Sequence, residues 1–239
     1  MKTTTVVGTC LALLLATGCA TPTVELKYPH QYGPAPDAPQ YAWHHLRFKW
    51  FWPEDEKPDW YLDPLIADLV LSDLITRHRE SLPLWRFHRR AGRSPAGHQF
   101  SFIFYTSPPV AREIRDSATG HPVTRRLLET GRLEKVHLTR PGNAAALSAT
   151  SDPNWPKPVQ ATWPMFIMGV SQTWLGLVEL HAGDTAGLDD DLDRALTRYR
   201  GVNDSVDEMW SRYAQHAFFH HLSGVFGYEP VTLRKRMRF

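Results

Sequence analysis

Hydrophobic and polar residues alternate along residues 41–52, and this pattern predicts a half-buried β-strand. Arg47 and Lys49 fall on one face of the expected strand. The other face is apolar and carries Leu46, Phe48, Trp50 and Trp52. One side of this strand should therefore face a hydrophobic core and the other should face solvent.

Two further alternating segments, 85–91 and 98–105, are separated by a turn rich in Gly and Pro and predict a β-hairpin near residues 85–105. In the first segment the aromatic side chains lie on one face and the basic ones on the other. The basic members are Arg86, His88 and Arg90. In the second segment the apolar face carries Phe100, Phe102 and Phe104.

Several other segments have helical periodicity. Asp63 is expected to cap a helix that starts at Pro64 and runs to about Glu80. Residues 164–182 are apolar nearly all round, which predicts a buried helix. The length of this helix would allow a membrane span, but its polar residues make a span the weaker interpretation.

A shorter helix is expected from about Asp190 to a stop at Gly201. Ser205 and Glu208 have the spacing of a capping box, which predicts the start of a last long helix over 206–222. The remaining expected elements are two short helices after Ser107 and from Pro122 to Gly131, a strand at 134–138, a surface loop at 139–161 and a final strand at 231–239. Strands and helices are mixed without a regular βαβ rhythm, so we expect an α+β domain around an antiparallel or mixed sheet.

The N-terminus has the layout of a secretory signal, with Lys2 followed by an apolar run and small residues before Cys19. The segment from Leu15 to Cys19 resembles the lipobox of bacterial lipoproteins. That resemblance implies cleavage after residue 18 and a lipid on the Cys19 sulfur. An ordinary signal peptide, or a buried N-terminal helix with an incidental cysteine, is the alternative. Ala20 favours the outer membrane over retention in the inner membrane.

Residues 19–40 are predicted to be a lipidated cysteine followed by a proline-rich tether. The sequence contains two cysteines, Cys10 and Cys19, so the mature chain would form no internal disulfide. We expect residues 41–239 to form one globular domain that faces the periplasm. Its positive and negative charges nearly balance, 27 against 25 over the whole chain, which argues against a nucleic-acid-binding protein.

Arginine clusters supply the main candidate for a binding site. Arg86, His88 and Arg90 share one strand face, and Arg234 and Arg236 share a face of the expected final strand. Guanidinium groups suit phosphate and carboxylate ligands because they donate two parallel hydrogen bonds. If the two strands were neighbours, they would form one anion-binding surface. The alternative is a solvated face whose charges keep edge strands from pairing.

His216 and His220 lie one helical turn apart and could direct two imidazoles at one metal ion, for which zinc is the natural candidate. The sequence shows no third ligand, and a solvated polar face explains the same spacing. Ser171 follows Gly169 as in a hydrolase elbow, but it lies in an expected helix and Thr173 replaces the second glycine. A buried serine bonded to a carbonyl one turn back is the better interpretation.

No set of residues converges as a catalytic group, so we expect no catalytic residue. The sequence favours an outer-membrane-tethered lipoprotein that binds an envelope protein or an anionic envelope component without catalysis. One alternative is an envelope hydrolase or metal-dependent enzyme centred on His216 and His220. Another is a purely structural subunit of an envelope assembly.

Overall fold

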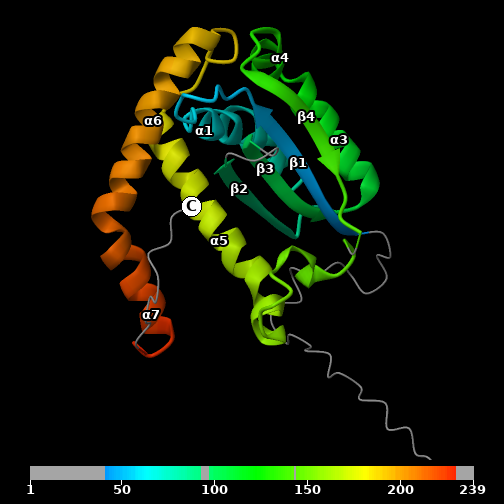
Figure 1. Ribbon diagram of the computed structural model, residues 1–239, viewed down its shortest axis with the longest axis vertical. Helices are drawn as coiled ribbons and strands as arrows, with labels where there is room; N and C mark the ends of the chain where they lie inside the picture. Colours follow the sequence, from blue (N-terminus) through cyan, green and yellow to red (C-terminus); the bar gives the residue numbers. More distant parts are fainter. Residues whose placement is uncertain (1–40, 93–96, 143, 230–239) are drawn as a thin grey trace, which may run out of the picture.

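The computed structural model describes residues 41–92, 97–142 and 144–229, in which four strands form one antiparallel sheet in the order β2-β3-β1-β4 (Figure 1). The strands are β1 (Ala42–Trp50), β2 (Leu84–Gly92), β3 (Gly97–Thr106) and β4 (Leu133–Thr139). The expected hairpin is confirmed as β2 and β3, and the α+β class is confirmed. β1, the first strand of the described residues, lies inside the sheet between β3 and β4.

Helices cover one face of this sheet, with α3 packed against β1 and β4 and α5 packed against β2. The helical elements are α1 (Leu62–Ile66), the π-helix η1 (Ala67–Ser72), α2 (Asp73–Arg77), α3 (Pro108–Gly120), α4 (Pro122–Glu129), the 3-10 helix η2 (Leu147–Thr150), α5 (Lys157–Ala182), α6 (Leu192–Tyr213), the π-helix η3 (Ala214–His220) and α7 (His221–Val225). The two short helices expected after β3 are confirmed as α3 and α4.

The covered face is built from side chains that alternate along the strands, as the sequence predicts. β1 and β3 pair so that Leu46 lies opposite Phe102 and Phe48 lies opposite Phe100. All four side chains are fully buried, and the Phe48 and Phe100 rings lie 6.3 Å apart between centroids. This face is therefore the wall of the hydrophobic core. The opposite face carries mostly polar side chains, but near the start of β1 it also holds Trp43 and Tyr105, which are buried and donate to the Leu147 and Ala145 carbonyls.

The expected helix over 164–182 is confirmed within α5, which begins earlier, at Lys157. We expected it to be buried, but its buried residues form one stripe, and Phe166, Val170 and Leu180 on the other side are 46%, 47% and 80% exposed. The reason is position: α5 lies along the β2 side of the sheet, with neighbours on part of its surface only.

Ser171 is a structural residue of α5. Its hydroxyl donates to the Ile167 carbonyl at 2.8 Å, as expected for a buried helical serine, and accepts a hydrogen bond from the Phe87 backbone N–H at 3.0 Å. Because β2 is an edge strand, this N–H has no strand partner on its outer side. Ser171 therefore satisfies a buried backbone donor and attaches the helix to the sheet.

We expect Ser171→Ala to lower the free energy of unfolding by about 1–3 kcal/mol, because a buried N–H would lose its partner. Thr173→Ala is the matched control, since the Thr173 hydroxyl also bonds one turn back, to the Gly169 carbonyl, but is exposed. The control should change stability by less than about 0.5 kcal/mol. Urea denaturation measures both, and equal effects would contradict the role given to Ser171.

Two expected helix boundaries are wrong. Helical structure begins at Leu62, before Pro64, and Asp63 does not cap it because the Asp63 carboxylate is bound by side chains from the sheet. The predicted break at Gly201 is absent as well. α6 runs without interruption through Gly201 and through the expected capping box, and its actual N-cap is Asp191, which accepts from the Arg194 N–H at 3.0 Å.

Gly201 is thus an exposed glycine in the interior of a helix, with no atom within 4 Å of the position that a Cβ would occupy. Replacing it by alanine should raise the free energy of unfolding by about 0.5–1 kcal/mol, because glycine loses more backbone entropy on folding. Gly131 is the contrasting control. It has φ +70°, so Gly131→Ala should destabilise the protein. Destabilisation by Gly201→Ala would contradict a continuous α6 and would favour a helix that ends at Gly201.

No helix within the described residues is long and apolar enough to cross a membrane. Cys19 and the tether at 19–40 lie outside the described residues, as does the expected final strand at 231–239 with Arg234 and Arg236. The proposal that two basic strands are neighbours therefore stays a prediction.

Candidate anion-binding site

The sheet face opposite the core is basic. Beyond an apolar row of Trp43, Tyr105 and Leu84 at one end, its side chains fall into three rows that cross all four strands, as the strand register dictates. The rows, each read from β4 through β1 and β3 to β2, are Thr139–His45–Ile103–Arg86, His137–Arg47–Ser101–His88 and Lys135–Lys49–Gln99–Arg90. No carboxylate occupies any of these twelve positions. We call this surface the basic face.

A pocket of about 370 Å³ lies on the basic face. Three strands contribute arginine or histidine side chains to its wall, and β3 contributes the floor between them. The lining residues are His45, Arg47, Arg86, His88, Arg90, Gln99, Ser101, Ile103 and His137. Three guanidinium groups and three imidazoles thus surround a volume that could hold a small anion.

Hydrogen bonds hold Arg47 and His45 in a defined arrangement at the centre of the pocket. Arg47 donates to the Thr139 hydroxyl at 2.7 Å and to Nδ1 of His45 at 2.9 Å. A guanidinium can only donate, so Nδ1 of His45 must accept, and the ring proton of neutral His45 is on Nε2. This Nε2 is buried without a hydrogen-bond partner among the described residues. The pocket therefore contains an oriented N–H donor that is unused.

The arginines of the pocket also have unused capacity. Nε of Arg86 is buried without a hydrogen-bond partner, and no ion pair within the described residues involves Arg47, Arg86 or Arg90. Lys49, at the edge of the basic face, differs because it pairs with Glu134 at 2.6 Å. A buried guanidinium without a counter-charge is costly, and a bound anion would remove that cost.

The pKa values in the pocket reflect burial and crowding of positive charge. Burial lowers the pKa of Arg86 to about 10. Burial, followed by the charges of Arg47 and Arg86, lowers the pKa of His45 from 6.5 to about 4. The pKa values of His88 and His137 are lowered in the same way, first by burial and then by neighbouring cations. At neutral pH the imidazoles are therefore neutral donors, and the arginines carry the charge.

Three of the five residues predicted for anion binding lie in this pocket: Arg86, His88 and Arg90. Sequence reasoning missed His45, Arg47 and His137, which come from β1 and β4. The alternation along residues 41–52 already placed Arg47 on the polar face of its strand. What the sequence did not reveal was that β1 would pair with β3 and so approach β2.

Arg89, which lies between these residues in sequence, belongs to the opposite face. Its Nε donates to the buried Asp63 carboxylate at 2.9 Å, and its Nη2 donates to the Trp60 carbonyl at 2.9 Å and to the Asn203 side-chain oxygen at 3.1 Å. The same carboxylate accepts from Trp50 Nε1 at 2.8 Å. These contacts join β1, β2, α1 and α6, so Arg89 and Asp63 have a structural function.

His216 and His220 are exposed on η3, with ring centroids 5.3 Å apart and planes inclined by 10°. His221 approaches both rings at 5.4 Å. Within the described residues no group of three or more His, Cys, Asp or Glu is arranged to hold a metal ion. The structure thus adds no support for zinc at this position.

Comparison of the chain with models of protein families, with curated proteins and with solved structures found no match in any of the three. Function has to be inferred from the basic face and from the sequence.

Proposed function

We propose that this protein is a lipid-anchored, non-catalytic binding protein of the bacterial envelope that captures a phosphate-type anion in the pocket of the basic face. The observation that carries the proposal is the cluster of Arg47, Arg86 and Arg90 around one pocket with no carboxylate partner among the described residues. A planar carboxylate suits one guanidinium fork. Several guanidinium groups from different strands suit a tetrahedral, doubly charged oxyanion better.

Phosphate of this kind occurs in envelope glycans and in lipid headgroups, so the two sources must be separated by experiment. Calorimetric titration of the mature, lipidated protein in detergent would compare inorganic phosphate, a soluble sugar phosphate and a short-chain phosphatidylglycerol. Tighter binding of the sugar phosphate would favour a glycan, and tighter binding of the lipid would favour a headgroup. Absence of saturable binding for all three would contradict the proposal.

The affinity for anions should depend on pH. Sulfate is a suitable probe because it remains a dianion over the whole range. Bound sulfate favours the charged form of His45, His88 and His137, so binding takes up protons, and affinity should rise between about pH 7.5 and about pH 5. Calorimetry at each pH measures this change. A pH-independent affinity would show that the imidazoles do not face the ligand.

Without a bound anion, the stability of the protein should fall as the pH falls, in contrast to the affinity for sulfate. The folded-state pKa of His45 lies below its ordinary value of 6.5, so the unfolded chain takes up protons first as the pH falls. The contribution of this group to stability is present above pH 6.5 and is lost as the pH falls towards about 4. Thermal denaturation in chloride and in sulfate buffers would separate the two trends.

The anchor is proposed on the sequence around Cys19 and has its own test. Labelling of cells with a fatty-acid analogue should mark the protein, and Cys19→Ala should abolish the label. Fractionation should place the labelled protein in the outer membrane, facing the periplasm. Retained labelling of the alanine variant would contradict lipidation at Cys19.

A further inference from the structure

Large apolar side chains that remain exposed are concentrated at two helix ends. One is the first half of α5. The other is a helical arm, residues 210–228, formed by the end of α6 with η3 and α7. The exposed residues are Val159, Phe166 and Val170 on α5, and Trp210, Tyr213, Phe219, Leu222, Val225, Phe226 and Tyr228 on the helical arm. Val225 and Phe226 are 83% and 70% exposed.

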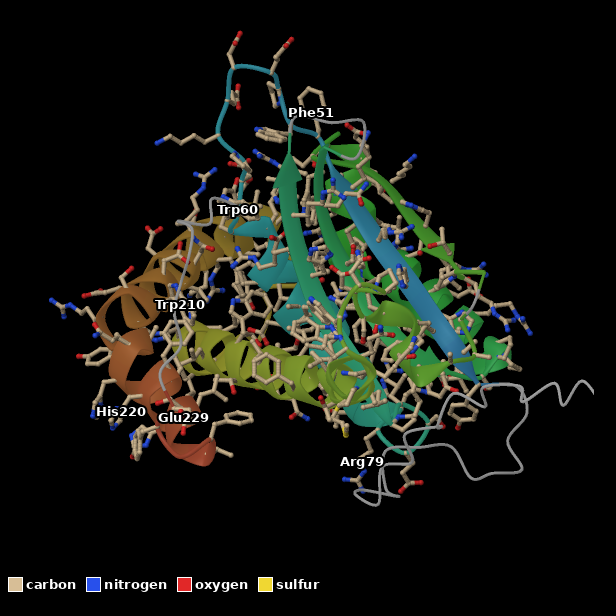
Figure 2. The ribbon with its side chains drawn as sticks, turned by 60° about the horizontal axis from the view of Figure 1, so that its bottom comes forward. Phe51, Trp60, Arg79, Trp210, His220 and Glu229 are labelled. Carbon is tan, nitrogen blue, oxygen red and sulfur yellow. The ribbon has the colours of Figure 1, made fainter. Side chains whose placement is uncertain are left out.

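The helical arm projects away from the sheet. η3 packs on α6, α7 packs on η3, and Figure 1 shows α7 at the lower end of the molecule, apart from the strands. Figure 2 shows Trp210 and His220 on this arm, on the other side of α5 from the sheet. The described residues therefore leave the aromatic side chains of the arm without a core to enter.

Charge is distributed unevenly along the same helices. No Asp or Glu occurs between Asp152 and Glu179, or between Glu208 and Glu229, so both exposed apolar regions are free of carboxylates. The opposite end of the helical pair, where α5 is followed by α6, is acidic. Its carboxylates are Asp184, Asp189, Asp190, Asp191 and Asp193. The apolar end, which has no carboxylates, can therefore approach an anionic surface, whereas the acidic end would be repelled by it.

β1 and α5 both pack against η2. η2 connects the two, because Trp43 Nε1 donates to the Leu147 carbonyl at 3.0 Å and the Ser151 hydroxyl donates to the Gln160 carbonyl at 2.8 Å. β1 is where the chain arrives from residues 1–40. The tether proposed to lead to Cys19 would therefore join the domain near the apolar end.

We propose that the first half of α5 and the helical arm together dock on the headgroup region of a lipid bilayer, with the acidic end pointing away from it. Trp and Tyr favour this region because their rings are amphipathic, and Phe is common on the apolar face of helices that lie in the interface. The contact is peripheral, and an apolar helix face lying in the interface is an established way of membrane binding. The orientation inferred from the tether depends on the proposed lipid at Cys19. The exposed apolar residues and the uneven charge support docking independently of that lipid.

The test uses the full, lipidated protein in vesicles of phosphatidylethanolamine and phosphatidylglycerol. Cys10 would be removed with the signal and the Cys19 sulfur would carry the lipid, so an introduced cysteine would be the only free thiol. Val225→Cys places an environment-sensitive fluorophore on the helical arm. Leu180→Cys is the matched control, since Leu180 is 80% exposed near the acidic end of α5. Nitroxide-bearing lipids then report contact with the bilayer.

We expect a blue shift and strong quenching for the fluorophore at position 225, and neither change at position 180. Vesicle flotation with equal, negligible quenching at both positions would overturn the docking proposal and leave the anchor intact. Efficient crosslinking between two copies through position 225, without quenching, would also overturn it and would assign the surface to self-association. Protein that does not float with the vesicles would overturn both the docking and the anchor.

Discussion

Asp63→Ala should destabilise the protein by about 3–5 kcal/mol, because it would leave a guanidinium without its counter-charge in a largely buried site. The Asp63 side chain is fully buried, and Arg89 is held by it and by the faces of Trp60 and Trp174, at 5.2 and 5.1 Å from the ring centroids. The substitution would also remove the acceptor for Trp50 Nε1. Urea denaturation measures the loss.

Asp73→Ala is the matched control for this effect. Asp73 also pairs with an arginine, Arg77, at 2.9 Å, but both side chains are more than half exposed. An exposed pair one helical turn apart contributes about 0.3–0.5 kcal/mol. Equal losses for the two alanine variants would show that burial of the Asp63 pair has no special energetic role.

The second large effect concerns the pocket of the basic face. Arg86→Gln and Arg47→Gln should each weaken phosphate or sulfate binding by about 10-fold to 100-fold, since a hydrogen bond to a charged group contributes about 1.5–3 kcal/mol. Arg115→Gln is the control, because Arg115 lies on α3, across the sheet, and pairs with Asp116 at 2.7 Å. A general charge effect would reduce binding equally in all three variants.

Stability separates a binding role for Arg86 from a structural one. Arg89 has a buried carboxylate partner, whereas Arg86 is largely buried without one among the described residues. Arg86→Met should therefore maintain or raise the melting temperature in anion-free buffer while it abolishes anion binding. A lower melting temperature with unchanged binding would show that Arg86 stabilises the sheet instead.

Much of the architecture could be predicted from local sequence. Alternation located the strands and assigned Arg47, Arg86 and Arg90 to polar faces, because side-chain direction in a strand depends on position alone. The hairpin between β2 and β3 could also be predicted from neighbouring residues alone. The composition of the pocket could not be predicted locally, since it depends on β1 entering the sheet beside β3, a contact between residues 50 to 64 positions apart in the sequence. Only part of the anion-binding set could therefore be named.

Errors occurred where tertiary contacts outweighed local signals. Gly201 and the capping-box spacing favoured a helix break, yet packing of Tyr199 and Val202, both buried, holds α6 continuous across the glycine. Asp63 has the sequence of an N-cap, but the partners that engage its carboxylate come from β1 and β2. The π-helical segments η1 and η3 leave no signal in the hydrophobic periodicity of the sequence.

The most direct test of anion binding is a crystal of the full-length protein soaked in selenate, an analogue of sulfate whose selenium atom can be located by anomalous scattering. We predict an anomalous peak on the basic face, within hydrogen-bond distance of the Arg47 and Arg86 guanidinium groups. Peaks at surface arginines such as Arg115, with none in the pocket, would contradict anion binding at the basic face.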